Sequence, residues 1–287
     1  MDAGTRGKTV LDIFLINLAS SQDRLSRMRD VFSAQGLSFE RIDAVDAASL
    51  SEDVIRDIVL PAVSKHARNL TPTEIGCYLS HKKAWETALS RGLNYAAIFE
   101  DDIHLAPDAG KLLSAAADWL PEGADLIKLE TLAMPTHVSR AGKVLMATPH
   151  RLKKLLSSHY GAAGYMVSRR AMERLCAASD PLPLPVDDVI FGAHYRVFGG
   201  LRAYQIDPAI CVQDQYIESP EAGRLGIVST IRDRHASLPV THAGRSLIKR
   251  GLDGLSTKLI RRRRKTRIAL LQALGRAEQK TIPFARD

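Results

Sequence analysis

The chain has 287 residues, of which 45% are hydrophobic and 25% charged, values that are ordinary for a globular protein with a sizeable core. Its three cysteines, Cys77, Cys176 and Cys211, are scattered and show no C-x-x-C spacing, which argues against a disulfide framework and favours a reducing compartment. The sequence has no apolar leader and no window of about 18 uncharged apolar residues, so it predicts neither a signal peptide nor a transmembrane helix.

Positive charge is concentrated at the C-terminal end. Residues 224–287 carry 16 Lys and Arg against 4 Asp and Glu, whereas the preceding residues carry 24 against 28. The formal net charge of +8 therefore belongs to the tail and says little about the chemistry of the body. We expect a mildly acidic globular body followed by a strongly basic extension.

The first half of the chain alternates strand and helix signals. VLDIFLINL at 10–18 predicts a buried strand, and Ser20 or Ser21 can cap a helix that ends near Gln35, before Gly36. The next elements are expected to be a short strand at 38–47, a helix from Thr71 to Gly92, a strand at 95–99, a helix at 108–119 and a strand at 124–130. The helix from Thr71 has the clearest signal, because a Thr N-cap, a Pro at the first helical position and a Glu three residues after the cap form a capping box.

The second half begins with residues 131–158, which are predicted to be an irregular, basic loop. Beyond them we expect a strand at 161–168, a helix at 169–178, a Pro-rich turn with a short helix at 179–199 and strands at 201–213. Strands that alternate with helices predict an α/β fold with a mainly parallel central sheet.

Three adjacent carboxylates, Glu100, Asp101 and Asp102, follow the predicted strand that ends at Phe99. Ligands of such sheets bind outside the carboxyl ends of the strands, so this triplet would lie at the binding edge. Carboxylate oxygens hold hard divalent cations, and such a cation can neutralise the diphosphate that leaves when a group is transferred from a nucleotide diphosphate. A solvated acidic turn is the alternative.

Five sequence blocks in a fixed order carry a resemblance to a known family. They cover roughly residues 9–215 and read IFLINLASSQDR, FERIDAVDA, LTPTEIGCYLSHKKAWE, AAIFEDDIHL and GAAGYMVSRRAMERL. In this order they resemble glycosyltransferase family 25, which includes bacterial lipooligosaccharide galactosyltransferases and collagen galactosyltransferases. The resemblance implies a GT-A-like fold with a single nucleotide-sugar-binding catalytic domain, which we expect at 9–223. The charge pattern predicts that a basic, partly amphipathic helical extension follows at 224–287.

The acidic triplet is, in this resemblance, the counterpart of the family's DXD-type motif. Asp102 is then expected as a direct metal ligand and Glu100 as a second one. Glu100 and Asp101 are also expected to contact the metal shell or the ribose and sugar of the donor. The cation would be Mn²⁺, with Mg²⁺ as the alternative, and which carboxylate touches it stays open.

Further donor-binding residues are expected beside the triplet. Asn17 and Arg24 follow the first strand, where Arg24 would meet a phosphate or the base; an exposed helix arginine is the alternative. In the block GCYLSH, Gly76 permits close approach of the backbone, and Ser80 and His81 offer hydrogen-bond partners for the donor. A purely structural histidine is the competing interpretation.

Lys128 and Glu130 alternate with apolar residues and so project to one face of their strand, where they would bind phosphate and orient the sugar. A buried ion pair is the alternative. Transfer with inversion needs a general base. Members of the family that the chain resembles carry an acidic residue after a similar proline-containing turn, so Asp187 or Asp188 in PVDDVI is expected to be the base or an acceptor ligand, with helix capping as the alternative. Weaker acceptor-side candidates are His159, Tyr160 and Gln213.

The tail contains one apolar helical face, formed by Ile248, Leu252, Leu255 and Leu259, with basic residues at 261–265 beside it. A basic amphipathic helix of this kind binds anionic membrane surfaces. Packing of the helix on the body is the alternative. Nucleic-acid binding ranks last, because the tail almost lacks aromatic residues and has no reading motif.

These patterns together predict a glycosyltransferase that moves a hexose, most plausibly galactose, from a UDP-sugar. The acceptor would be a sugar hydroxyl of lipopolysaccharide or lipooligosaccharide, and the family resemblance implies inversion of configuration. The same chemistry on a capsule glycan or a protein hydroxyl is one alternative. A non-catalytic membrane- or RNA-binding module with a degenerate transferase fold is the other. The expected location is the cytoplasm, at the inner face of the membrane if the tail anchors there.

Overall fold

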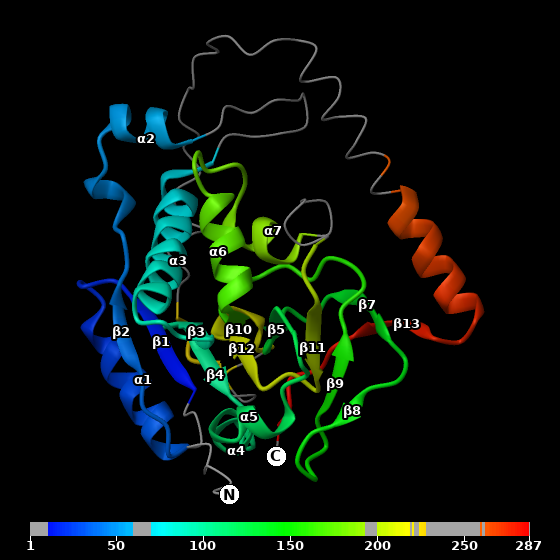
Figure 1. The fold of residues 1–287 in the computed structure, drawn as a ribbon. Helices are drawn as coiled ribbons and strands as arrows, with labels where there is room; N and C mark the ends of the chain where they lie inside the picture. The colour runs from blue at the N-terminus through cyan, green and yellow to red at the C-terminus, as the bar shows by residue number, and fades with distance from the viewer. Residues whose placement is uncertain are drawn as a thin grey trace, which may run out of the picture.

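The computed structural model describes residues 11–59, 70–192, 200–218, 220, 224–227, 259 and 262–286. Within them, eight strands form one central sheet in the order β2-β1-β3-β10-β5-β11-β9-β8 (Figure 1). In chain order these strands are β1 (Asp12–Asn17), β2 (Glu40–Asp43), β3 (Tyr95–Glu100), β5 (Leu126–Lys128), β8 (Lys143–Val144), β9 (Arg151–Lys154), β10 (Gly164–Ser168) and β11 (Ala203–Asp207). The strands predicted at 10–18, 38–47, 95–99 and 161–168 are confirmed.

The central sheet is mixed. β1 pairs in parallel with β2 and β3, and β5 pairs in parallel with β11. β10 runs antiparallel between β3 and β5, and β9 and β8 are also antiparallel to their neighbours. Because β10 opposes both β3 and β5, those two strands run in the same direction, so β1, β3, β5 and β11 all end at one edge. A mainly parallel sheet was predicted, and β9 and β10 are the strands that run against the common direction, whereas β8, antiparallel to β9, runs with it.

Helices cover both faces of the sheet (Figure 1). They are α1 (Gln22–Ala34), α2 (Glu52–Ile58), α3 (Pro72–Ser90), α4 (Ala109–Ser114), α5 (Ala116–Trp119), α6 (Arg169–Ala177) and α7 (Val186–Phe191). Trp85, Met172 and Val189 bring α3, α6 and α7 into one buried apolar cluster, and Phe32 and Trp119 bring α1 and α5 into a second. Two apolar layers around a sheet confirm the predicted α/β class.

The helix α3 begins as the sequence predicts. Oγ1 of Thr71 accepts a hydrogen bond from the N–H of Glu74 at 3.2 Å, and the Glu74 carboxylate accepts one from the N–H of Thr71 at 2.8 Å. Gly92 follows the helix with a φ of 75°, which glycine adopts without strain. The helix predicted at 108–119 is instead two short helices, α4 and α5, separated at Ala115.

The segment 131–158 contains three strands, so the prediction of an irregular loop was wrong. They are β7 (Pro135–Ser139), β8 and β9. β9 pairs with β11, and β7 pairs antiparallel with β13 (Ala277–Thr281). Both partners lie far away in the chain, and strand formation here depends on those pairings more than on local propensity.

A second sheet lies at the carboxyl edge of the first. Its order is β4 (Ile103–Leu105), β12 (Cys211–Gln213) and β6 (Glu130–Thr131). The strand predicted at 124–130 therefore breaks at Leu129 into β5 and β6, which belong to different sheets. Since β12 pairs with β4 directly after the acidic triplet, residues from 211–213 are carried to the predicted site.

The C-terminal residues return to the body. After a helix at 262–273, β13 pairs with β7, and Oγ1 of Thr131 donates to the carbonyl of Ile282 at 2.6 Å. Three of the four apolar residues of the predicted tail face lie outside the described residues: Ile248, Leu252 and Leu255. The fourth, Leu259, is exposed. A domain boundary near residue 223 stays a prediction.

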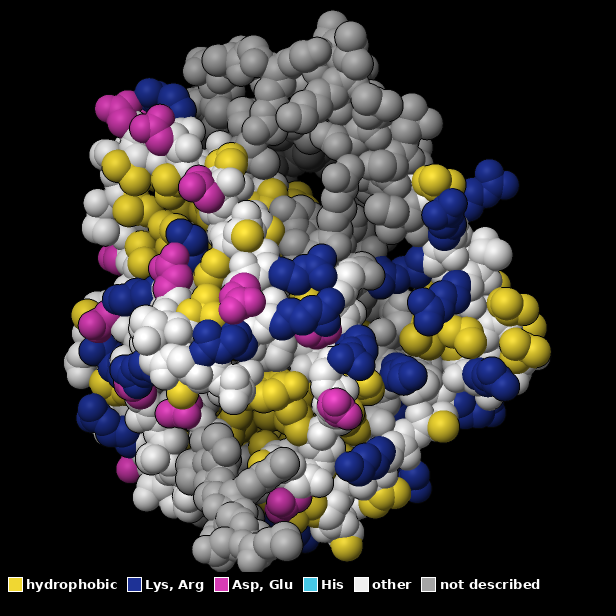
Figure 2. All heavy atoms as spheres, viewed as in Figure 1, with side chains coloured by type: hydrophobic (Ala, Val, Ile, Leu, Met, Phe, Trp, Pro, Cys, Tyr) yellow, Lys and Arg dark blue, Asp and Glu magenta, His cyan; other side chains and the backbone are white. Residues whose placement is uncertain are grey.

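The helix at 262–273 carries basic side chains beside hydrophobic ones, as Figure 2 shows at the right of the view. Leu270 and Leu274 are exposed there, whereas Ile268 is buried. In the part of the chain that the structure describes, no helix has the length and apolar character needed to cross a membrane.

Candidate functional site

The acidic triplet lies at the carboxyl end of a central strand. Glu100 is the last residue of β3, and Asp101 and Asp102 form the turn into β4. Both aspartates are buried, and Glu100 is only partly exposed. Carboxylates with so little exposure to solvent need hydrogen-bond donors or positive charge around them, because burial destabilises the ionised form.

Glu100 and Asp102 converge on one amide group. Nε2 of Gln213 lies 3.3 Å from Oε2 of Glu100, and 3.3 and 3.2 Å from the two oxygens of Asp102. Gln213, a weaker acceptor-side candidate in the sequence, reaches this point from the end of β12. Two acidic side chains from one turn thus face a common centre.

The protonation of this pair reflects its burial. Burial, together with the charges of Asp101 and Asp187, raises the pKa of Glu100 to about 7. Burial likewise raises the pKa of Asp102 to about 7, with the charge of Glu100 as the next cause. Neighbouring carboxylates that resist ionisation together, and that present hard oxygen ligands to one point, fit a divalent cation such as Mn²⁺ or Mg²⁺.

Asp101 faces the other way. Its Oδ2 accepts a hydrogen bond from Nδ2 of Asn17 at 2.6 Å, and its Oδ1 lies 3.1 Å from NH1 of Arg24. Oδ1 of Asn17 accepts in turn from Nε of Arg41 at 2.9 Å. The structure therefore brings Asn17 and Arg24 to the triplet, where they compensate the Asp101 charge. Contacts of these three residues with a donor stay a prediction.

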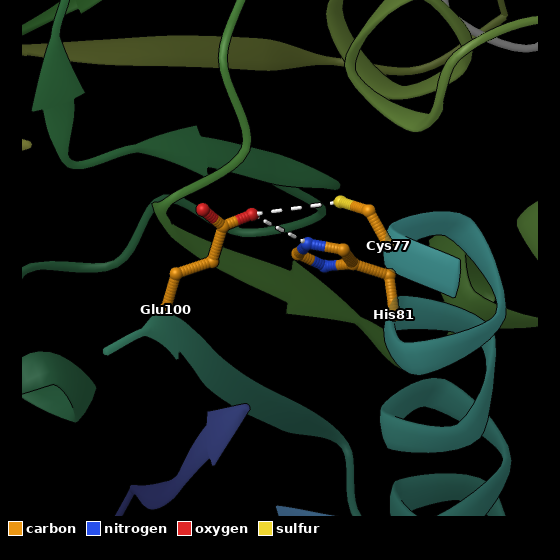
Figure 3. A group of neighbouring side chains, drawn as sticks. All are labelled: Cys77, His81 and Glu100. Carbon is orange, nitrogen blue, oxygen red and sulfur yellow. Dashed lines mark hydrogen bonds and ion pairs between the residues drawn. The ribbon is translucent and has the colours of Figure 1, made fainter. Parts of the chain in front are cut away.

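His81 reaches the triplet from α3 (Figure 3). Its Nε2 lies 3.1 Å from Oε1 of Glu100, and the Cys77 thiol, one turn earlier, donates to the same oxygen at 3.7 Å. Nδ1 of His81 lies 3.0 Å from the hydroxyl of Tyr165, which also accepts from Nε1 of Trp85 at 2.8 Å. Burial lowers the pKa of His81 to about 4, so its imidazole is neutral near pH 7. Its contact with a donor stays a prediction.

Ser80, on the same helix, makes two bonds within the fold. Its Oγ donates to the carbonyl of Gly76 at 2.6 Å and accepts from the N–H of Val45 at 2.8 Å. Gly76 and Ser80 are both buried, and these bonds tie α3 to the loop that follows β2. That Gly76 or Ser80 contacts the donor stays a prediction. Such a contact would have to form while Ser80 keeps both of these hydrogen bonds.

Lys128 and Glu130 form the buried ion pair that was the alternative to donor binding. Nζ of Lys128 donates to Oε1 of Glu130 at 2.7 Å and to the carbonyl of Gly161 at 2.7 Å, and both charged side chains are fully buried. The N–H of Ala163 donates to the same Oε1 at 3.0 Å. Burial raises the pKa of Glu130 to about 7, against the lowering effect of Lys128. A direct donor contact by either residue stays a prediction.

Asp187 and Asp188, the candidates for the base, begin α7. Asp187 accepts hydrogen bonds from the N–H groups of Gly161 at 3.1 Å and Asp188 at 3.0 Å. The charge of Asp187 helps to raise the pKa of Glu100. The N-cap of α7 is Pro185, without a side-chain cap, so neither aspartate occupies the N-cap position. The role of base stays a prediction.

The loop before β10 holds the remaining weaker candidates. His159 is buried, and its Nδ1 lies 2.8 Å from Oε1 of Gln205 on β11. Burial, followed by the charge of Lys128, lowers the pKa of His159 to about 3. Tyr160 is partly exposed. This loop packs over the ends of β5 and β11, so both residues lie at the edge of the sheet that carries the triplet.

Sequence reasoning missed two side chains at this site. Cys77 lies four residues before His81, and this spacing alone would have placed them on one face of a helix. Arg27 lies on α1 three residues after Arg24, which is again a shared helical face. Burial lowers the pKa of Arg27, while nearby carboxylates such as Asp102 oppose that effect. The site therefore holds a second arginine close to the triplet.

Divalent cations should bind this site more tightly as the pH rises from about 6 to about 8, because they compete with protons on Glu100 and Asp102. A carboxyl with a raised folded-state pKa contributes stability that is present below its unfolded pKa of about 4 and lost as the pH rises through its folded value. A bound cation offsets that loss. The rise in melting temperature on adding Mn²⁺ should thus be larger at pH 8 than at pH 6, and equal shifts would contradict this.

Comparisons with known proteins agree with the sequence blocks. Residues 10–190 match the model of glycosyltransferase family 25 (LPS biosynthesis protein). The lacto-N-neotetraose biosynthesis glycosyltransferase LgtE of Neisseria gonorrhoeae is 34% identical, over 70% of this chain and 73% of that protein. The lipooligosaccharide biosynthesis protein lic2B of Haemophilus influenzae is 29% identical, over 78% of this chain and 84% of its own.

The crystal structure of a glycosyltransferase involved in the glycosylation of the major capsid of PBCV-1 was also compared with this chain. The aligned region covers 71% of this chain and 91% of that one, at 10% sequence identity and a TM-score of 0.40. That score is too low to assign a common fold. The family model spans more than half of this chain, and LgtE exceeds 30% identity over more than two thirds of it. The chain therefore belongs to glycosyltransferase family 25 and is a glycosyltransferase.

Proposed function

We propose that this enzyme transfers galactose from UDP-galactose to a sugar hydroxyl of lipooligosaccharide or lipopolysaccharide, with inversion and with the help of a divalent cation on a GT-A-like domain. The observation that carries the proposal is the convergence of Glu100 and Asp102 on Nε2 of Gln213, at the carboxyl edge of the sheet. Ligands of α/β sheets bind at that edge. Related proteins act in lacto-N-neotetraose and lipooligosaccharide biosynthesis, which supports the acceptor class.

Asp102 and Glu100 would hold Mn²⁺, or Mg²⁺ as the alternative, and that cation supplies the positive charge that stabilises the leaving diphosphate. Arg24 and Arg27 on α1 add fixed positive charge beside the same turn. Asp101, held by Asn17 and Arg24, keeps the turn in one conformation. These residues therefore bind and orient the diphosphate part of the donor in this proposal.

Asp187 is the better of the two candidates for the base that removes the proton of the acceptor hydroxyl. It lies close enough to Glu100 to affect its pKa, and the N–H of Gly161 fixes one of its oxygens. A base beside the cation-binding carboxylates can receive the acceptor proton while the sugar is transferred. Lys128 and Glu130 would act by holding the 159–163 loop over this position.

Other acceptors remain as alternatives, namely a capsule glycan or a protein hydroxyl. The basic C-terminal helix, with Leu270 and Leu274 exposed beside its arginines, supports a peripheral contact with an anionic membrane, where a glycolipid acceptor is found. A non-catalytic binding module is the alternative of a different class. The buried, convergent carboxylates argue against it, because burying unused charge is costly.

A donor screen tests the proposal. The purified full-length chain is incubated with Mn²⁺ and each common nucleotide sugar, and release of the free nucleotide is measured with and without a lipooligosaccharide acceptor. We expect UDP release from UDP-galactose, faster with the acceptor and absent in EDTA. Release from another nucleotide sugar alone would overturn the donor assignment, and no release from any donor would overturn the catalytic proposal.

A further inference from the structure

Three side chains that can bind a transition metal meet beside the predicted site for the hard cation (Figure 3). Cys77 and His81 lie one turn apart on α3, and Glu100 ends β3. Their Sγ, Nε2 and carboxylate oxygen all lie within 4.8 Å of one another. The three atoms come from two rigid elements of the core, so the fold itself sets their positions.

The separations match a tetrahedral centre. With zinc bonds of about 2.3 Å to sulfur and about 2.1 Å to nitrogen and oxygen, a tetrahedral site places sulfur about 3.6 Å from oxygen and nitrogen about 3.4 Å from oxygen. The structure has Sγ of Cys77 at 3.7 Å and Nε2 of His81 at 3.1 Å from Oε1 of Glu100. Both separations from the carboxylate oxygen therefore lie within about 0.3 Å of the tetrahedral values, and the third pair of ligand atoms lies within 4.8 Å.

The surroundings also suit a metal-bound imidazole. Such a histidine keeps its outer ring nitrogen in a hydrogen bond that fixes its tautomer and orientation. Here Nδ1 of His81 lies 3.0 Å from the hydroxyl of Tyr165, which Nε1 of Trp85 holds at 2.8 Å. His81, Tyr165 and Trp85 are buried, so the imidazole is oriented with Nε2 toward Cys77 and Glu100.

We propose that Cys77, His81 and Glu100 form a binding site for Zn²⁺ or a chemically similar borderline-soft cation, which adjoins the oxygen-ligand site and shares Glu100 with it. Thiolate and imidazole select zinc over Mn²⁺ and Mg²⁺, which prefer oxygen ligands. On binding, the metal replaces the thiol proton of Cys77, which passes to solvent, and a water completes the fourth position. When Zn²⁺ occupies this site, Glu100 would no longer be available to the cation that binds the diphosphate. Zinc would therefore inhibit transfer.

Cobalt titration of the full-length chain tests the site directly, because Co²⁺ reports thiolate ligation by a charge-transfer band in the near ultraviolet. We expect the wild-type chain to show this band, Zn²⁺ to displace it, and Cys77→Ser to lose it. Cys77→Ser should also weaken Zn²⁺ binding by at least about ten-fold. Cys176→Ser is the matched control, since that half-buried thiol lies on α6, and it should keep both properties.

A second variant protects the test against a folding defect in Cys77→Ser. Glu100→Gln should keep the charge-transfer band, because the thiolate remains, but bind Zn²⁺ more weakly. A band that persists in Cys77→Ser, or its absence from the wild-type chain, would overturn the proposal. The inhibition rests on the proposed function, whereas the cobalt band does not. Failure of the donor screen with an intact band would thus count against the proposed donor and acceptor alone.

Discussion

Asp102→Asn should lower the turnover of UDP-galactose by roughly 100- to 1,000-fold while leaving the chain folded. Asn keeps the shape of the side chain and can still bond to Gln213, but it removes the negative charge that would hold the cation. The loss should appear in kcat, because the cation stabilises charge that develops only as the diphosphate leaves. The measurement is the initial rate of UDP release at saturating donor and Mn²⁺.

Asp53→Asn is the control for this substitution. Asp53 lies on α2 with a largely exposed carboxylate and pairs with Arg56, three residues later. The same chemical change there should leave turnover within about two-fold of the wild-type value, as surface pairs contribute little. An Asp102→Asn enzyme that kept nearly full activity would show that this carboxylate has no part in catalysis.

Lys128→Met should destabilise the fold by about 3–5 kcal/mol, because it leaves the carboxylate of Glu130 buried without its cation. Met keeps the length and apolar stem of lysine, but it cannot donate to Glu130 or to the carbonyl of Gly161. The contact of Nζ with the ring of Phe191, at 4.6 Å from its centroid, is lost as well. Urea unfolding at about pH 8 measures the effect. At lower pH Glu130 can take up a proton, and the cost should shrink.

Lys82→Met provides the surface comparison, because Lys82 pairs with Glu86 on the solvent side of α3 and should cost less than about 1 kcal/mol. The double variant Lys128→Met/Glu130→Leu should recover part of the lost stability, since no unpaired charge then remains. If Lys128→Met cost no more than Lys82→Met, the buried pair would have no structural importance.

The elements that the sequence predicted well are those decided by local chemistry. The capping box at Thr71 and the glycine at Gly92 fix the two ends of α3 within the chain itself. The predicted strand 10–18 contains β1, whose run of β-branched and aromatic residues favours a buried strand. By contrast, β7 exists because it pairs with β13, about 140 residues later, and residues 135–139 show no strong strand pattern of their own.

The acidic triplet shows the same limit for the functional site. Its position after β3 follows from the sequence pattern, the place of Asn17 and Arg24 beside it follows from their position after the first strand, and that of His81 follows from the family resemblance. The sequence did not predict which partners each of the three carboxylates contacts. Asp101 bonds to Asn17 and Arg24, whereas its neighbours face Gln213, because adjacent residues in a turn point in different directions.

The ion pair of Lys128 and Glu130 shows where sequence spacing is ambiguous. Two residues on one face of a strand can project toward a ligand or toward each other, and burial decides between these outcomes. Here the 159–163 loop contacts both side chains: the carbonyl of Gly161 accepts from Lys128, and the N–H of Ala163 donates to Glu130. The pair is therefore buried beneath this loop. That loop follows the segment whose strands the sequence did not predict.

A crystal structure of the chain with Mn²⁺ and UDP tests the central claim most directly, with the metal located by its anomalous scattering. The account predicts one anomalous peak between the carboxylates of Glu100 and Asp102, bonded to the diphosphate of a nucleotide at the carboxyl edge of the central sheet. Manganese and UDP bound together elsewhere, with these two carboxylates still on Gln213, would contradict it.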